Sequence, residues 1–169
     1  MVATKRKRKT TGRQSGFTIV EVLIVLAIAG LIMVVVFLAV PALQRSGRNN
    51  SLSSNARGVV AAVGNYMTNN SGAAPAAITF TSGTSVVIGA AGTNQETARL
   101  DNSVSAMSLN GAAITSSSAI GTLQIVTGTT AVCNTTATGL SATAGSPRSY
   151  VVLYVAESGS GPILKCVGS

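Results

Sequence analysis

The chain has 169 residues, of which 12 are Lys or Arg and only four are Asp or Glu, for a formal net charge of +8 at neutral pH. It contains two cysteines and no histidine. Without a Ser/His or Cys/His pair, and with so few acids, the composition excludes the common catalytic dyads and offers no ligand set for a metal ion. We therefore expect neither an enzyme nor a cofactor-binding protein.

The amino-terminal leader is strongly basic. Six of the twelve cations fall within the first 16 residues, and no acid offsets them: Lys5, Arg6, Lys7, Arg8, Lys9 and Arg13. A basic run of this kind also occurs in nuclear-localisation and nucleic-acid-binding segments. Because an apolar segment follows here, the positive-inside rule explains the same residues and predicts a cytoplasmic amino terminus, with the chain after Val40 on the far side of the membrane.

An uninterrupted apolar run extends from Val22 to Val40. Its 19 residues would form a helix of about 28 Å, close to the hydrocarbon thickness of a bilayer. A buried helix of a soluble protein is usually shorter, and so is the apolar region of a secretory signal, although Val40-Pro41-Ala42 imitates a signal cleavage site. A permanent signal anchor would fit the run, but neither signal type explains the acidic residue Glu21 at its edge.

Glu21 belongs to a longer pattern at the entry of the apolar run. A small residue, Gly16, is followed by Phe17, Thr18, two aliphatic residues, Glu21 and the apolar segment. A carboxylate at the edge of a membrane helix costs about 1–3 kcal/mol, so a compensating partner is expected. Over Gly16 to Val40 the sequence resembles the type IV pilins and pseudopilins, which share the class III signal peptide.

This resemblance implies a processing reaction and an assembly contact. It implies cleavage between Gly16 and Phe17 by the prepilin peptidase on the cytoplasmic side, followed by N-methylation of Phe17. The new amine, with an ordinary pKa of about 7.7–8, is then mostly cationic. In the family, the Glu of one subunit meets this amine on a neighbour, so Glu21 is expected to set the register of assembly: a broken buried pair costs about 3–5 kcal/mol.

The apolar run is expected to continue into an amphipathic helix. Pro41 lacks an N–H group and should kink or loosen the helix. Beyond it, apolar residues recur at spacings of three and four, which predicts one buried helix face: Leu52, Ala56, Val59, Val60, Val63, Tyr66 and Met67. A helix from Phe17 to Met67 would be about 76 Å long and would end at the Asn69–Gly72 cluster. Its arginines are expected to remain solvated: Arg45, Arg48 and Arg57.

After Ala73 the composition shifts to Ala, Ser, Thr, Gly and Val. Six strands are predicted, over 78–81, 85–88, 104–109, 122–127, 150–156 and 163–167. Residues 157–162 are expected to form a flexible hairpin loop, and Glu96 and Asp101 to be solvated loop charges. An antiparallel sheet laid over the long helix would bury both apolar faces, which predicts an α+β fold with one small domain.

The two cysteines both lie near the carboxyl end. An even number on the exported side favours one disulfide between Cys133 and Cys166, and two buried free thiols are the alternative. With 32 residues between the partners, the bond would stabilise the domain by about 3–4 kcal/mol in the chain-entropy account. The arrangement also resembles the disulfide-bounded loop of many type IV pilins.

These expectations divide the chain into a cleaved leader (1–16), a membrane and assembly helix (17–41), an amphipathic continuation (42–72) and a β-rich domain (73–169). The resemblance implies a structural pilus subunit, the major one by its low-charge domain. Such a subunit is made in the inner membrane, polymerised by the assembly machinery there into an extracellular homo-oligomeric filament, and serves adhesion, twitching motility or DNA uptake.

Two alternatives remain open at this stage. A pseudopilin of a type II secretion or competence system shares the entry pattern, and a monomeric signal-anchored surface adhesin shares the membrane segment. Nucleic acid is not an evident partner of the mature chain, because six cations face four acids, although Arg45, Arg48 and Arg57 could meet phosphate along a filament.

Overall fold

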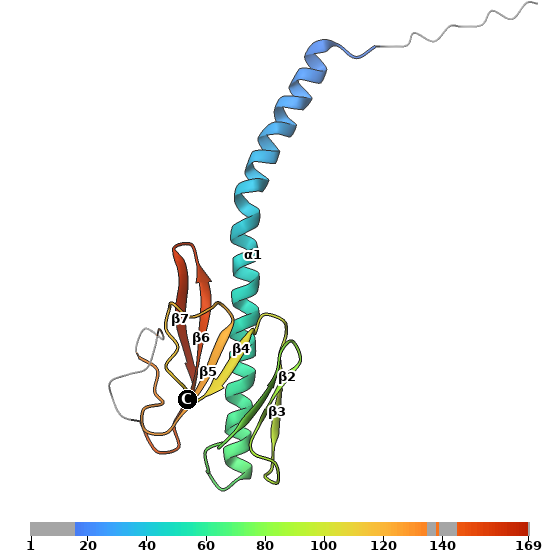
Figure 1. The fold of residues 1–169 in the computed structure, drawn as a ribbon. Coiled ribbons are helices and arrows are strands. Elements are labelled where there is room, and N and C mark those ends of the chain that lie inside the picture. The colour runs from blue at the N-terminus through green and yellow to red at the C-terminus, as the bar shows by residue number, and fades with distance from the viewer. Residues whose placement is uncertain (1–15, 135–137, 139–144, 169) are drawn as a thin grey trace, which may run out of the picture. The chain divides into compact units, whose positions relative to one another are not determined.

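A computed structural model describes residues 16–134, 138 and 145–168, and the cations of the leader lie outside these residues. Within these residues the chain forms one long helix and two small sheets, which confirms the predicted α+β class (Figure 1). The helix α1 runs over Ile19–Asn69. The chain divides into two compact units, Met1–Val40 and Pro41–Ser169, which are described separately below.

The first unit contains the apolar part of α1. Its large apolar side chains are all exposed, from 39% at Val40 to 85% at Phe17. Since Leu, Ile, Val and Ala occur on every side of the helix, no face is polar enough to be the obvious solvent side. The first unit therefore has apolar surface to bury and no part of its own to bury it against.

The second unit is organised around the carboxyl-terminal half of α1. The predicted apolar face is confirmed: Leu52, Ala56, Val59, Val63, Tyr66 and Met67 are buried and Val60 is partly buried. Two residues that the apolar pattern missed, Asn55 and Ala62, are buried on the same face.

The end of α1 is also where the sequence predicts it. The Gly72 N–H donates to the Met67 carbonyl at 2.6 Å, and Ser71 and Gly72 have positive φ angles of 59° and 83°. This is a Schellman-type ending, in which left-handed residues turn the chain back onto the last helical carbonyls.

The first sheet is an antiparallel meander of three short strands, in the order β1-β2-β3. They are β1 (Ile78–Thr81), β2 (Ser85–Ile88) and β3 (Glu96–Arg99). The second sheet has the order β4-β5-β6-β7, with β4 (Ala106–Leu109), β5 (Thr122–Thr127), β6 (Tyr150–Ser158) and β7 (Gly161–Gly168). In this sheet β4 and β5 are parallel, and the other pairs are antiparallel.

The second sheet is buried on both faces. On one face, Leu123, Ile125 and Val152 join the core cluster formed with α1 and the first sheet. On the other face, Val151, Leu153, Val155 and Cys166 pack with Ile114 and Ala131 of the connecting loops. Burial on both sides explains why β6 reads as an almost continuous apolar run instead of an alternating one.

A buried glutamine fastens these loops to the sheet. Gln124 of β5 is 2% exposed, yet all of its side-chain polar atoms are bonded. Its Oε1 accepts from the Ile114 N–H at 3.1 Å, and its Nε2 donates to the Gly111 and Ala112 carbonyls at 2.9 and 3.0 Å. The Gln124 amide therefore supplies the hydrogen bonds that a neighbouring strand would otherwise give to the backbone of loop residues 111–114.

The structure differs from the sequence-based expectation in three respects. The prediction of one antiparallel sheet was wrong, because there are two sheets and one of them contains a parallel pair. Strand β3 was not predicted, since only Ala98 of its four residues is buried. The expected flexible loop over 157–162 is mostly strand: Ser158 pairs with Gly161, which leaves a tight turn of Gly159 and Ser160.

Candidate processing and assembly site

The residues of the entry pattern lie at the start of α1. Gly16 and Phe17 are exposed and precede the first helical residue, Ile19. A Cβ atom built on Gly16 would meet no other atom within 4 Å. The peptide bond between Gly16 and Phe17 is therefore in non-helical, open backbone, the form in which a protease can bind a chain.

Thr18 and Glu21 form a capping box at this helix start. The Glu21 N–H donates to Thr18 Oγ1 at 3.3 Å, and the Thr18 N–H donates in return to Glu21 Oε2 at 3.4 Å. Such reciprocal bonds satisfy two amide groups that the first turn leaves unpaired. The sequence reasoning assigned Glu21 only to a neighbouring chain and missed this local role, which the Thr-x-x-Glu spacing signals.

Glu21 also lies in an apolar hollow. Phe17, Val22, Val25 and Leu26 line this hollow together with Glu21 on one side of the helix. Among the described residues that line this hollow only Glu21 is charged, and its Oε2 accepts from the Thr18 N–H before the first helical turn. A cation that approached residue 17 along this side would meet both the carboxylate and apolar contact surface.

Comparison with known protein families bears on this stretch. The prokaryotic N-terminal methylation motif matches residues 11–37. The chain carries the class III signal motif of type IV pilins. The match confirms the resemblance and supports a type IV pilin-like or pseudopilin protein, and the motif implies processing by a prepilin peptidase and assembly at the membrane. No curated protein and no solved structure matches the chain.

The membrane segment fits a membrane-anchored precursor. Among the residues that the structure describes, one helix, α1, is long and apolar enough to cross a bilayer, with a mean hydropathy of 3.3 over its most apolar window, and none of that window is buried. It lies near the amino terminus, directly after the motif's Gly16 and Phe17.

Pro41 lies inside α1, next to the boundary between the two units. The helix continues through it, although its missing N–H leaves the Phe37 carbonyl without the usual helical donor. The predicted kink stays a prediction. The residues directly after Pro41 are still exposed, and the first buried residue of α1 is Leu52.

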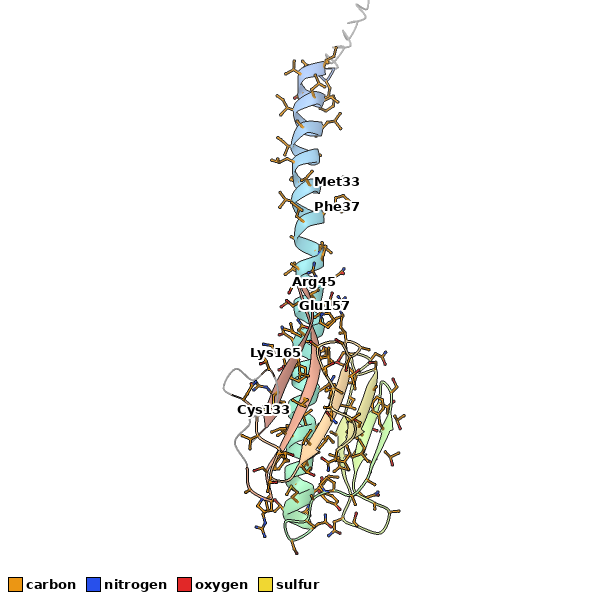
Figure 2. All side chains as sticks on the ribbon, turned by 60° about the vertical axis from the view of Figure 1, so that its left-hand side comes forward. Met33, Phe37, Arg45, Cys133, Glu157 and Lys165 are labelled. Carbon is orange, nitrogen blue, oxygen red and sulfur yellow. A yellow bond between two sulfur atoms is a disulfide. The ribbon has the colours of Figure 1, made fainter. Side chains whose placement is uncertain are left out.

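Cys133 and Cys166 are joined in a disulfide, with their Cα atoms 5.6 Å apart. The alternative of two free thiols does not hold. Cys166 belongs to β7 and packs in the cluster on the outer face of the second sheet, so the bond fastens the segment around Cys133 to the last strand (Figure 2).

Glu157 anchors the β6–β7 hairpin to α1. Its Oε2 accepts from Arg48 Nε at 3.2 Å and also from Arg48 Nη2, and its Oε1 lies 3.9 Å from Arg45 Nε. Figure 2 shows Arg45 and Glu157 next to each other. The Asn49 side chain donates to the Glu157 carbonyl at 2.6 Å and accepts from the Glu157 N–H at 2.8 Å. Arg48 and Arg57 are exposed, as expected, whereas Arg45 is partly buried, and the pairing of Arg45 and Arg48 with Glu157 was not predicted.

The two acids expected as solvated loop charges also make specific contacts. Asp101 accepts from Asn55 Nδ2 at 2.8 Å and from the Ser103 N–H at 2.8 Å. Hydrogen bonds from Ser103, and also from Asn55, outweigh partial desolvation and lower the pKa of Asp101. Glu96, in β3, accepts from Asn69 Nδ2 at 2.7 Å. In the described part of the chain no three His, Cys, Asp or Glu side chains gather as a metal site would require.

Proposed function

We propose that the chain is a structural subunit of a type IV pilus, and its major subunit. It is made as an inner-membrane precursor with a cytoplasmic amino terminus, cleaved between Gly16 and Phe17, and N-methylated on Phe17. The observation that carries this proposal is the methylation motif at the open start of an apolar helix whose side chains are exposed all round.

Exposed apolar surface of this extent must be covered by something. In the precursor the cover is the bilayer, whose hydrocarbon thickness the segment matches. In a filament the cover is the same helix of other copies, so the segment leaves lipid without meeting water. Transfer between two apolar surroundings costs little, which makes assembly reversible in principle and controllable by polar contacts.

Glu21 is the polar contact that we assign to this control. In the hollow lined by Phe17, Val22, Val25 and Leu26, the carboxylate is available to a cation on another chain. The cleaved, methylated Phe17 amine of a neighbouring subunit supplies that cation, and the pair is formed only at the correct stagger. A misplaced subunit would leave a charge unpaired in apolar surroundings, at a cost of about 3–5 kcal/mol.

The second unit would then form the outer surface of the filament. Its sheets, the Cys133–Cys166 disulfide and the Glu157 anchor make it a self-contained body on α1. Adhesion, twitching motility or DNA uptake would be carried by this surface together with the assembly machinery, without catalysis by the chain itself.

Mass spectrometry of the protein sheared from intact cells tests the proposal. We expect an amino terminus at Phe17 bearing one methyl group, together with filaments in the sheared fraction. A Gly16→Val variant, which places a branched side chain at the cleavage position, should accumulate as the full-length precursor in the membrane. A native chain that starts at Met1 or Leu43 would contradict the proposal.

A pseudopilin is the second candidate, because the matched motif serves both classes equally. A pseudopilin would also start at methylated Phe17, but at native expression it would stay with the cell envelope. Processed protein in the cell fraction, with none in sheared surface filaments, would favour the pseudopilin.

A further inference from the structure

A hollow lies beside the carboxyl end of α1, within the second unit. It has a volume of about 530 Å³ and is open to solvent. It is lined by the last turns of α1, the turn that follows, and the entry to β6: Gly64, Met67, Thr68, Ser71, Gly72, Arg148 and Tyr150. The volume is in the range of small-molecule sites.

Two glycines let the polar side chains beside this hollow approach the helix end closely. A Cβ atom at Gly64 would come within 2.6 Å of the Tyr150 hydroxyl, and a Cβ atom at Gly72 would come within 2.7 Å of Arg148 Nε. The guanidinium therefore lies directly on the Gly72 backbone, and the tyrosine ring reaches the helix at Gly64. Glycine at both positions lets the two polar groups converge on one space.

The polar groups around the hollow have hydrogen-bonding capacity to spare. No described residue forms a hydrogen bond or an ion pair with the Arg148 guanidinium, the Tyr150 hydroxyl or the Ser71 hydroxyl. A guanidinium carries five N–H donors in a planar fork, and each hydroxyl can donate or accept. All three groups are thus free to bind a ligand.

Helix capping alone does not account for Arg148. A cation near a helix carboxyl end is favourable, but the final carbonyls of Tyr66 and Met67 already accept from Asn70 and Gly72. The guanidinium takes no part in this ending. Met67 and the Tyr150 ring supply apolar surface to the same hollow.

We propose that this hollow binds an acidic sugar, a pyranose ring that bears a carboxylate. The planar carboxylate matches the Arg148 fork, which can bind it through two parallel hydrogen bonds. The ring hydroxyls would pair with Tyr150 and Ser71, and the apolar face of the ring would pack on Met67. The open side lets the terminal unit of a longer glycan enter. This inference goes beyond the pilus role and holds for the unassembled chain as well.

The test is a titration of the full-length chain in detergent micelles, labelled with ¹³C on its methionine methyl groups. Met67 lines the hollow, whereas Met33 and Met107 lie outside it and serve as internal controls. We expect glucuronate to shift the Met67 signal saturably while the Met33 and Met107 signals stay in place. Glucose at the same concentrations should bind at least tenfold more weakly.

Two variants assign the binding to the hollow. Arg148→Gln should weaken glucuronate binding at least tenfold, about 1.4 kcal/mol, and Arg57→Gln, which removes an exposed cation elsewhere on α1, should leave it unchanged. An unchanged Met107 signal shows that each variant is folded. The proposal is overturned if Met67 shows no saturable shift, if Arg148→Gln binds as tightly as the wild type, or if inorganic phosphate binds as tightly as glucuronate.

Discussion

The Tyr150 hydroxyl lies over Gly64, so close that a Cβ atom on this residue would be 2.6 Å from it. At Gly58, six residues earlier on the same helix, an added Cβ atom would meet no other atom within 4 Å. The two glycines therefore serve different purposes, although both weaken the intrinsic preference for helix by about 1 kcal/mol relative to alanine.

Alanine substitutions separate these purposes. Gly58→Ala should stabilise the second unit by about 0.5–1 kcal/mol, because helix propensity rises and nothing is displaced. Gly64→Ala gains the same propensity but must move the Tyr150 ring, so we expect it to be less stable than Gly58→Ala by about 1–2 kcal/mol. Urea unfolding of the full-length chain in micelles measures the difference, and equal gains would show that the tyrosine adapts freely.

Asn49 should contribute more to stability than the more conspicuous Arg48. Asn49→Ala leaves a partly buried N–H and carbonyl of Glu157 without partners, which should cost about 1–3 kcal/mol. Arg48→Gln removes an exposed ion pair, worth about 0.2–1 kcal/mol. Thermal unfolding of both variants gives the order, with Asn50→Ala as a neighbouring exposed control expected to be neutral. A larger loss of stability in Arg48→Gln than in Asn49→Ala would contradict this order.

The lowered pKa of Asp101 predicts an acid-dependent loss of stability. Hydrogen bonds from Ser103 and Asn55 stabilise the charged form of Asp101 in the folded chain. In the unfolded chain the pKa of this carboxyl is about 3.9, so on acidification the unfolded chain takes up the proton first. The contribution of the Asp101 charge to the free energy of unfolding is therefore complete above the unfolded pKa. It is lost as the pH falls through the lower pKa of the folded chain.

Asp101→Asn should remove this dependence. Unfolding midpoints of wild type and variant, compared from pH 5 down to pH 2, should converge as the pH falls. A constant difference across this range would mean that the Asp101 charge has no part in stability.

Assembly should depend on Glu21 more than processing or folding does. Glu21→Gln keeps an acceptor for the Thr18 N–H but removes the charge, so we expect cleavage and methylation at Phe17 with few or no filaments. Thr18→Val removes the hydroxyl of the capping box and keeps the charge, and it should assemble better than Glu21→Gln. Filament yield in sheared fractions and mass spectrometry of the membrane fraction check the two expectations. Normal yield from Glu21→Gln would rule out the charge pair.

Local patterns account for what could be predicted from the sequence. The apolar run, the entry pattern at Gly16 and Phe17 and the helix face from Leu52 to Met67 depend on residues a few positions apart, and these features agree with the family match or the structure. Strand β6 was predictable because its apolar residues are consecutive.

Features made by distant residues could not be predicted. Strand β3 is ordered by its pairing with β2 and by the Asn69–Glu96 bond, and its own sequence is polar. The Asn49–Glu157 anchor and the hollow between Gly64 and Arg148 join segments that only the fold brings together. The parallel pairing of β4 with β5 likewise follows from the path of the loop between them.

The order in which the chain is made gives its last strands a particular importance. Glu157, which anchors the hairpin to α1, and Cys166, which closes the disulfide, both lie in β6 and β7. Until these strands have been synthesised and have paired, the cover over the sheet's outer face has no covalent attachment and the early turns of the packed helix have no anchor. A chain arrested before these strands would therefore contain all of α1 yet lack both the disulfide and the Glu157 anchor.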